Sequence, residues 1–201
     1  MPDSLILSEE EFALLADSEV LKRKHRVQHK VEQLLLQSGQ NLQQVISSHW
    51  EESKPPKLSR GENYHQQAYR VMDFPRMQDG ESFFLFRSLV LWGHPIGFHL
   101  IVSGHFMERL ASTFLQHHRD LAAHWYYSQQ EEPWIWEAEA PGLIPCAAIE
   151  TSVLRIAVQK RSFFKLSSFL PLQQYQELPA MSLARWQELS AILSPFHGTR
   201  V

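Results

Sequence analysis

The chain has 201 residues and a net charge of −3, and 44% of its residues are hydrophobic and 20% charged. This balance is ordinary for a folded globular protein and argues against disorder. The slight acidic excess argues against a dedicated nucleic-acid-binding protein, which usually carries a strong basic excess. The one cysteine, Cys146, excludes an internal disulfide and a Cys-based zinc site.

The length suits a single domain, 1–201, in which residues 1–52 form a helical N-terminal segment and residues 57–201 form an α+β body. No stretch holds the ~20 apolar residues needed to span a membrane. The N-terminus also lacks the basic start and the apolar run of a signal peptide. We therefore expect a cytoplasmic protein with no membrane partner.

Helices are predicted for the N-terminal segment. Ser8 precedes three glutamates, a pattern typical of a helix N-cap followed by acids in the first turn. Asp17 and Ser18 are expected to break this segment and to cap a second, longer helix. Gly39 is predicted to end the second helix, and Asn41 to begin a short third one.

Strands are predicted after the break at Pro55 and Pro56. Residues 69–74 form the first expected strand, which Pro75 should end. The strongest signal is a β-hairpin, with strands at 82–92 and 98–103 that are rich in aromatic and branched residues. Both faces of this hairpin are mostly apolar, so we expect both to be covered.

The remaining elements are helices and short strands. A helix is predicted at 105–118, strands at 134–136, 153–158 and 163–170, and a last helix at 182–193 with Ser182 as its N-cap. This grouping favours an α+β fold: N-terminal helices, then a mainly antiparallel sheet with the hairpin at about 82–103 in its centre, packed by helices at about 105–118 and 182–193.

The segment 57–107 resembles a group of uncharacterised bacterial proteins. The resemblance lies in Arg60-Gly61-Glu62-Asn63-Tyr64, Asp73-Phe74-Pro75-Arg76, Phe86-Arg87 and Trp92-Gly93, which match a pattern of Arg-Gly-Glu-Asn-Tyr and Asp-Tyr-Pro-Arg motifs. Phe74 stands where the pattern has Tyr. The resemblance implies that these residues recur together, and it implies no activity, cofactor or partner.

The first candidate site is a polar cluster that precedes the first expected strand. Polar residues on a loop held by a rigid scaffold are typical of binding sites. Glu62 or His65 could act as an acid or base, and Arg60 could bind an anion. The alternative is a polar turn whose side chains pair with each other. The cluster consists of Arg60, Glu62, Asn63, Tyr64 and His65.

The second candidate site lies on the hairpin and its neighbouring strand, at Asp73, Arg76, Arg87 and His99. A charged side chain in an apolar strand needs a partner, because burying a lone charge is costly. We expect Asp73 to pair with Arg87, with Glu62 as second choice. His99 shares a face with Arg87 only if the hairpin connection has an odd number of residues. The alternative to a pocket is a structural ion pair.

Two further features leave alternatives open. The basic stretch from Lys22 to Lys30 could be a solvated helix face, could bind phosphates, or could contact the acidic segment from Glu131 to Glu139 within one chain or across a homodimer. The aromatic residues near 125–127, with Trp134 and Trp136, could pack in the core or line a groove. The 11 histidines show no metal-binding signature, so we expect no metal and no cofactor.

Two functions remain as hypotheses. The first is a non-catalytic binding or scaffolding domain, either a monomer or a homodimer, with a polar pocket for a small anionic ligand or a protein partner. The second is an enzyme of unknown chemistry, with His65 or His99 as acid-base residue, Asp73 or Glu62 orienting it, and arginines holding an anion. The absence of recognised catalytic motifs favours the first, with nucleic acid an unlikely partner.

Overall fold

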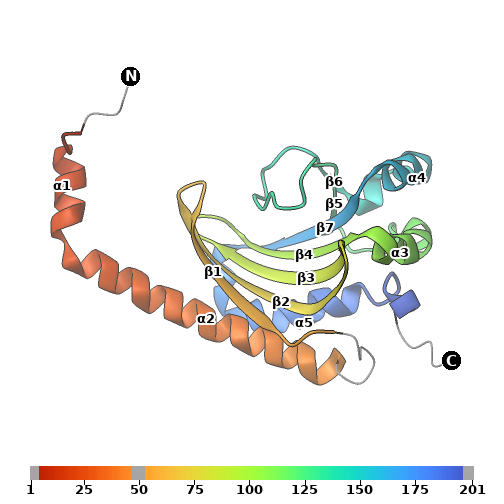
Figure 1. Ribbon diagram of the computed structural model, residues 1–201, viewed down its shortest axis with the longest axis horizontal. Helices are drawn as coiled ribbons and strands as arrows, with labels where there is room; N and C mark the ends of the chain where they lie inside the picture. The colour runs from red at the N-terminus through yellow and green to blue at the C-terminus, as the bar shows by residue number, and fades with distance from the viewer. Residues whose placement is uncertain (1–4, 47–52, 197–201) are drawn as a thin grey trace.

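The computed structural model describes residues 5–46 and 53–196 and shows an α+β fold. Helices come first, an antiparallel sheet follows, and further helices are interleaved with its later strands (Figure 1). In the described ranges the helices are α1 (Glu9–Ala16), α2 (Ser18–Ile46), α3 (Gly104–His117), α4 (Thr151–Lys160) and α5 (Leu178–Glu188).

Seven strands of the described residues form one antiparallel sheet, in the order β1-β2-β3-β4-β7-β5-β6. The predicted hairpin is confirmed as β3 and β4, and it lies in the middle of this order. The strands are β1 (Lys57–Tyr64), β2 (Gln67–Asp79), β3 (Ser82–Leu91), β4 (Ile96–Ser103), β5 (Tyr126–Ser128), β6 (Leu143–Pro145) and β7 (Phe163–Leu170).

The main core lies between one face of the sheet and the helices. α2 and α5 run beneath the sheet in Figure 1, and α3 packs at its end. Phe84 and Phe86 of β3 contact Trp186 of α5, with ring centroids 6.4 and 5.4 Å apart. Burying aromatic side chains of this size is the largest favourable contribution that such a layer makes to stability.

The opposite face of the sheet is covered by a loop instead of helices. This loop, residues 129–142, joins β5 to β6 and is called the Trp loop because it carries Trp134 and Trp136 (Figure 1). Trp136 packs on a second, smaller apolar cluster that includes Leu85 and Ile101. Both faces of the hairpin are therefore covered, as its apolar sequence predicts.

The N-terminal helices differ in part from the prediction. Asp17 separates α1 from α2 as expected, and its Oδ1 accepts a hydrogen bond from the Glu19 amide at 2.8 Å. The predicted end at Gly39 and the third helix from Asn41 are wrong, because α2 continues to Ile46. Gly39 serves close packing: a Cβ there would lie 2.9 Å from Sδ of Met72.

Three strand predictions are also corrected. Residues 153–158 belong to helix α4, where Leu154 and Val158 are buried four residues apart, the spacing of one helix face. Residues 134–136 lie in the irregular Trp loop. Pro75 does not end β2, because the pairing register shifts between Asp73 and Arg76 and lets the strand continue.

The last helix begins before its predicted N-cap. α5 starts at Leu178 with Pro179 in its first turn, a position that proline favours. Ser182 therefore lies inside the helix, fully buried, and its hydroxyl is 2.9 Å from that of Ser88 on β3. The hydroxyl joins α5 to the sheet and does not cap the helix.

Candidate ligand site

A row of polar residues crosses the sheet on the face beneath the Trp loop. Asp73 of β2 lies directly opposite Arg87 of β3, and Arg87 lies opposite His99 of β4. Directly opposite residues of neighbouring strands project to the same face of a sheet. The complete row is Lys57, Asp73, Arg87, His99, Ser167 and Tyr126.

Asp73 and Arg87 form the ion pair that the sequence predicts. Nε of Arg87 donates to Oδ1 of Asp73 at 2.7 Å, and its second nitrogen donates to Oδ2 at 2.9 Å. The guanidinium also lies 5.4 Å from the ring centroid of Trp134 and 4.8 Å from that of Trp136. Arginine prefers this combination of a two-point carboxylate contact and aromatic stacking.

The hairpin also settles where His99 lies. Leu89 pairs with Gly97, which leaves an odd number of residues between them, so Arg87 and His99 share a face. His99 is fully buried, and its Nδ1 lies 3.0 Å from Oγ of Ser167. Burial holds the pKa of His99 well below its usual range, with the charges of Lys165 and Arg87 acting in the same direction. The ring is therefore neutral at pH 7.

Lys165 of β7 is a second cation on this face, and no motif in the sequence indicates it. It is 1% exposed, and its Nζ donates to the carbonyl of Ile135 and lies 4.8 Å from the ring centroid of Trp136. Burial lowers the pKa of Lys165 to about 7, and the charge of Arg87 adds to the effect. Lys165 is the only charged residue of strand β7, and this is the sequence feature that could have marked it as a buried cation in need of a partner.

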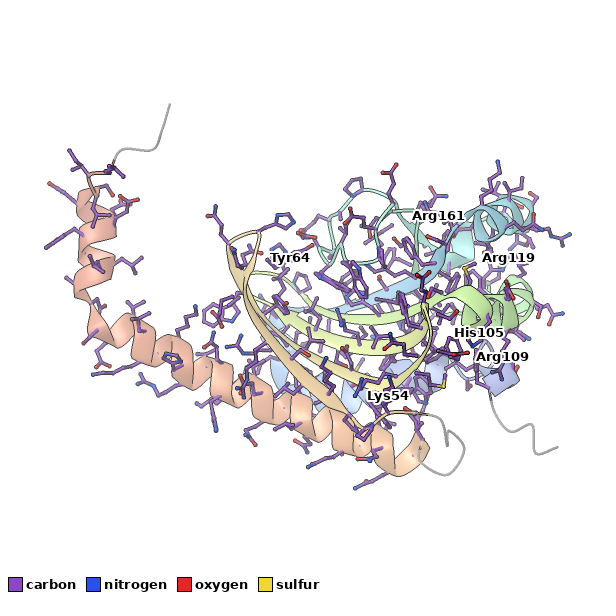
Figure 2. All side chains as sticks on the ribbon, viewed as in Figure 1. Lys54, Tyr64, His105, Arg109, Arg119 and Arg161 are labelled. Atoms are coloured by element: carbon purple, nitrogen blue, oxygen red, sulfur yellow. The ribbon has the colours of Figure 1, made fainter. Side chains whose placement is uncertain are left out.

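The Trp loop is held on the sheet by contacts from three elements. Arg161 donates to the carbonyl of Gln130 at 2.6 Å, and Tyr64 donates to Glu137 at 2.9 Å. Figure 2 shows Tyr64 and Arg161 on either side of this loop. Trp134 stacks on Phe83 of β3 with centroids 5.8 Å apart. The loop therefore covers the polar row as a fixed layer.

The predicted cluster from Arg60 to His65 does not form one pocket. It lies largely in strand β1, whose pairing with β2 shifts in register between Gly61 and Tyr64 and so divides the cluster between the two faces of the sheet. Arg60 and Glu62 contact the helical side, Tyr64 and His65 contact the Trp loop, and Asn63 is exposed. The expectation of a pocket between this cluster and the hairpin is thus corrected.

Arg60 and Glu62 belong to an ion-pair network with α2. Arg70 of β2 lies 2.8 Å from Glu32 and 2.9 Å from Glu62, and Arg60 lies 2.8 Å from Glu32. Lys24 completes the network at 2.7 Å from Glu62. Hydrogen bonds from Lys24 and then Arg70 lower the pKa of Glu62 to about 2. The two glutamates pair with three cations, and the network fastens α2 to the edge of the sheet.

No histidine–carboxylate pair of the predicted kind is found among residues 5–46 and 53–196. Asp73 is bound to Arg87 and Glu62 to Lys24 and Arg70, and neither carboxylate is bonded to His65 or His99. His65 is exposed, and its Nε2 lies 3.9 Å from Glu137. Across the same residues, no group of three or more His, Cys, Asp and Glu side chains is placed to hold a metal ion.

A cleft of about 210 Å³ opens beside Trp134, at the end of the polar row. Its walls come from the segment before β1, from β1 and β2, and from the start of β3, and Figure 2 shows Lys54 at the opposite end of β1 from Tyr64. Asp73 and Arg76, both predicted as site residues, line it. The lining residues are Lys54, Lys57, Asp73, Arg76, Met77, Gln78, Phe83, Phe84, Leu85 and Trp134.

The cleft carries an excess of positive charge. Lys54 and Lys57 are exposed, and neither makes an ion pair within residues 5–46 and 53–196. Nε of Arg76 donates to the carbonyl of Pro55 at 2.9 Å, which leaves its charge without a carboxylate in the same ranges. Among residues 5–46 and 53–196, Asp73 is the one acid that lines the cleft, and Arg87 already neutralises it. The arrangement can attract an anion.

Comparison with known proteins gives no match: no family model, no curated protein and no solved structure is similar to this chain. Among the described residues, none of the helices has the length and apolar character required to cross a membrane.

Proposed function

We propose that this protein is a non-catalytic binding domain that holds a small anionic ligand in the cleft beside Trp134. The observation that carries the proposal is the approach of Lys54, Lys57 and Arg76 to one cleft in which Asp73, the lone lining acid of the described part of the chain, is paired with Arg87. Cations without a protein carboxylate gain free energy from a bound anion, because charge-assisted hydrogen bonds are the strong ones.

The shape of the cleft restricts the ligand further. A volume of about 210 Å³ is smaller than the roughly 300–1,000 Å³ of sites for drug-sized molecules. Trp134 and Phe83 stack at an interplanar angle of 21° and supply an aromatic wall. A small anion with a planar group, such as an aromatic carboxylate or a phosphate ester, fits both features.

The proposal is tested with benzoate and phenyl phosphate as probes and benzylamine as a matched control of the same ring and opposite charge. Isothermal titration calorimetry and quenching of tryptophan fluorescence measure binding. We expect both anions to bind and benzylamine not to bind. Added salt should weaken binding, because the lysines are exposed and their charges are screened.

Variants locate the binding. Lys54→Ala and Lys57→Ala should each weaken binding at least about tenfold, since one charge-assisted hydrogen bond contributes about 1.5–3 kcal/mol and 1.4 kcal/mol is tenfold. Lys22→Ala is the control, because Lys22 is an exposed cation of α2 that pairs with Glu19. Equal binding of benzoate and benzylamine, or an equal loss in the Lys22 variant, would overturn the proposal.

The enzyme hypothesis finds less support in this geometry. An acid-base residue needs an orienting group within hydrogen-bond reach, and His99 has Ser167 in that place. Its Nε2 is buried and has no hydrogen-bond partner among the described residues. The binding function therefore remains our proposal.

A further inference from the structure

The N-terminal arm, defined as α1 with residues 18–30 of α2, runs from the edge of the sheet, where Lys24 and Gln28 contact Glu62, out to α1, which lies beyond the sheet and away from α4 (Figure 1). Every residue of α1 is exposed, including Phe12 at 64% and Leu15 at 74%. A helix of 8 residues is too short to be stable alone, because isolated helices of fewer than ~12–15 residues are marginal in water. Apolar side chains exposed on such a helix are typical of a surface that packs on a partner.

A matching surface lies on α4 at the other end of the molecule. Val153 is 51% exposed and Ile156 is 54% exposed. Arg155 and Lys160 are exposed beside them and make no ion pair with any described residue. The apolar side chains of α1 are accompanied by Glu9 and Glu10, also without an ion pair in the described ranges. The two helices therefore match in apolar character and are opposite in charge.

A second pair of oppositely charged surfaces lies on residues 22–30 of α2 and on the Trp loop. Arg26 and Lys30 of α2 make no ion pair among the described residues. In the Trp loop, Glu131, Glu132 and Glu139 are exposed and likewise make none within those residues. In Figure 1 the Trp loop and α4 lie on the same side of the sheet, so one side of the body offers an acidic partner to the basic part of the arm and a basic partner to α1.

We infer that the arm docks on the body of a second copy of this chain, with α1 on α4 and residues 22–30 of α2 along the Trp loop. In Figure 1 α1 and α4 lie at opposite ends of the molecule, so one copy cannot make these contacts within itself. A two-fold dimer makes each contact twice, since the same surface serves both copies. The dimer covers the apolar side chains of α1 and α4 together.

The oligomeric state is measured by sedimentation velocity and by light scattering after size exclusion, over a range of concentrations. We expect the mass of two chains for the unaltered protein. Leu15→Asp should give the mass of one chain, whereas Leu172→Asp, at a site 40% exposed and outside the arm and α4, should leave the dimer intact. Circular dichroism verifies that both variants are folded. Leu15 is exposed, so its replacement leaves the fold of one copy unchanged.

A charge exchange tests which surfaces meet. The variant with Glu9→Lys and Glu10→Lys, and the variant with Arg155→Glu and Lys160→Glu, should each dissociate, because each brings like charges together twice. An equimolar mixture should recover the dimer, since one contact is restored with reversed charges and the other is unaltered. A protein that has the mass of one chain at all concentrations, or a dimer that survives Leu15→Asp and both charge variants, would overturn the inference.

Discussion

Asp73 and Arg87 lie directly opposite each other on β2 and β3 and form two hydrogen bonds of 2.7 and 2.9 Å beneath the two tryptophans of the Trp loop. The pair neutralises the acid that would otherwise reduce the positive charge of the neighbouring cleft. It also explains why an arginine can occupy a strand made mostly of apolar residues, because each buried charge has its partner.

Removing one member of this pair should cost more than removing both. We expect Asp73→Ala to lower the free energy of unfolding by about 3–5 kcal/mol, because it leaves the Arg87 charge without a carboxylate. Asp73→Ala combined with Arg87→Ala should cost clearly less than the sum of the two single changes. Urea denaturation of the unaltered protein, the two single variants and the double variant completes this double-mutant cycle. Strictly additive losses in the free energy of unfolding would contradict the coupling between Asp73 and Arg87.

Lys165 should give the protein a stability that rises with pH. Its pKa is about 7 in the folded state and 10.5 as the ordinary value, so between these pH values the unfolded chain binds more protons. The free energy of unfolding then increases from pH 7 towards pH 10.5, by at most about 1.4 kcal/mol per pH unit. Lys165→Met should lack this increase.

Urea denaturation from pH 7 to pH 9 compares the two proteins. The difference between them isolates Lys165, because other groups titrate equally in both. The neighbours that influence Lys165 are Arg87, which lowers its pKa, and Glu137, which raises it. Parallel pH profiles for the two proteins would show that Lys165 keeps its ordinary pKa.

Gly97 makes room for the buried imidazole of His99. A Cβ at Gly97 would lie 2.3 Å from Nε2 of His99, much closer than atoms in contact allow. We expect Gly97→Ala to destabilise the protein by about 1–3 kcal/mol through overpacking. In a His99→Ala background most of that cost should disappear, and thermal or urea unfolding of the four proteins measures it. An equal cost in both backgrounds would place the clash elsewhere.

Glu62 should contribute to stability against acid. Its pKa is about 2 in the folded state and 4.5 as the ordinary value, so its contribution is complete above pH 4.5 and is lost as the pH falls towards 2. The effect should be small, because the side chain is 52% exposed and solvent screens it.

Glu62→Gln tests this contribution by acid-induced unfolding. Below pH 4.5 the stability of this variant should fall less steeply than that of the unaltered protein. Glu108→Gln is the control and should behave like the unaltered protein, because Glu108 is exposed and makes no ion pair among the described residues. If both variants follow the unaltered protein, the network of Lys24, Arg70 and Glu62 contributes no measurable stability.

Local sequence determined the central hairpin and the ion pair at its heart. Runs of aromatic and branched residues separated by turn residues such as Gly and Pro are typical of strands. A lone arginine within such a run requires an acid nearby, because burying an unpaired charge is costly. That reasoning identified Asp73 as the partner of Arg87. The same local rules fail for residues 153–158, because branched residues fit both a strand and the buried face of a helix, and only packing decides between them.

Tertiary structure alone decided the candidate site. Pairing of β1 with β2, with its register shift between Gly61 and Tyr64, set which face each residue from Arg60 to His65 joins, and no residue type in the sequence announces that shift. The Trp loop brought Trp134 over Arg87, which lies 47 positions earlier in the sequence, and β7 brought Lys165 to the same face. Sequence thus determined which residues need partners, because a charged residue within an apolar strand needs an opposite charge whatever the rest of the fold. Only the folded chain decided which partners they have and which cations remain without one.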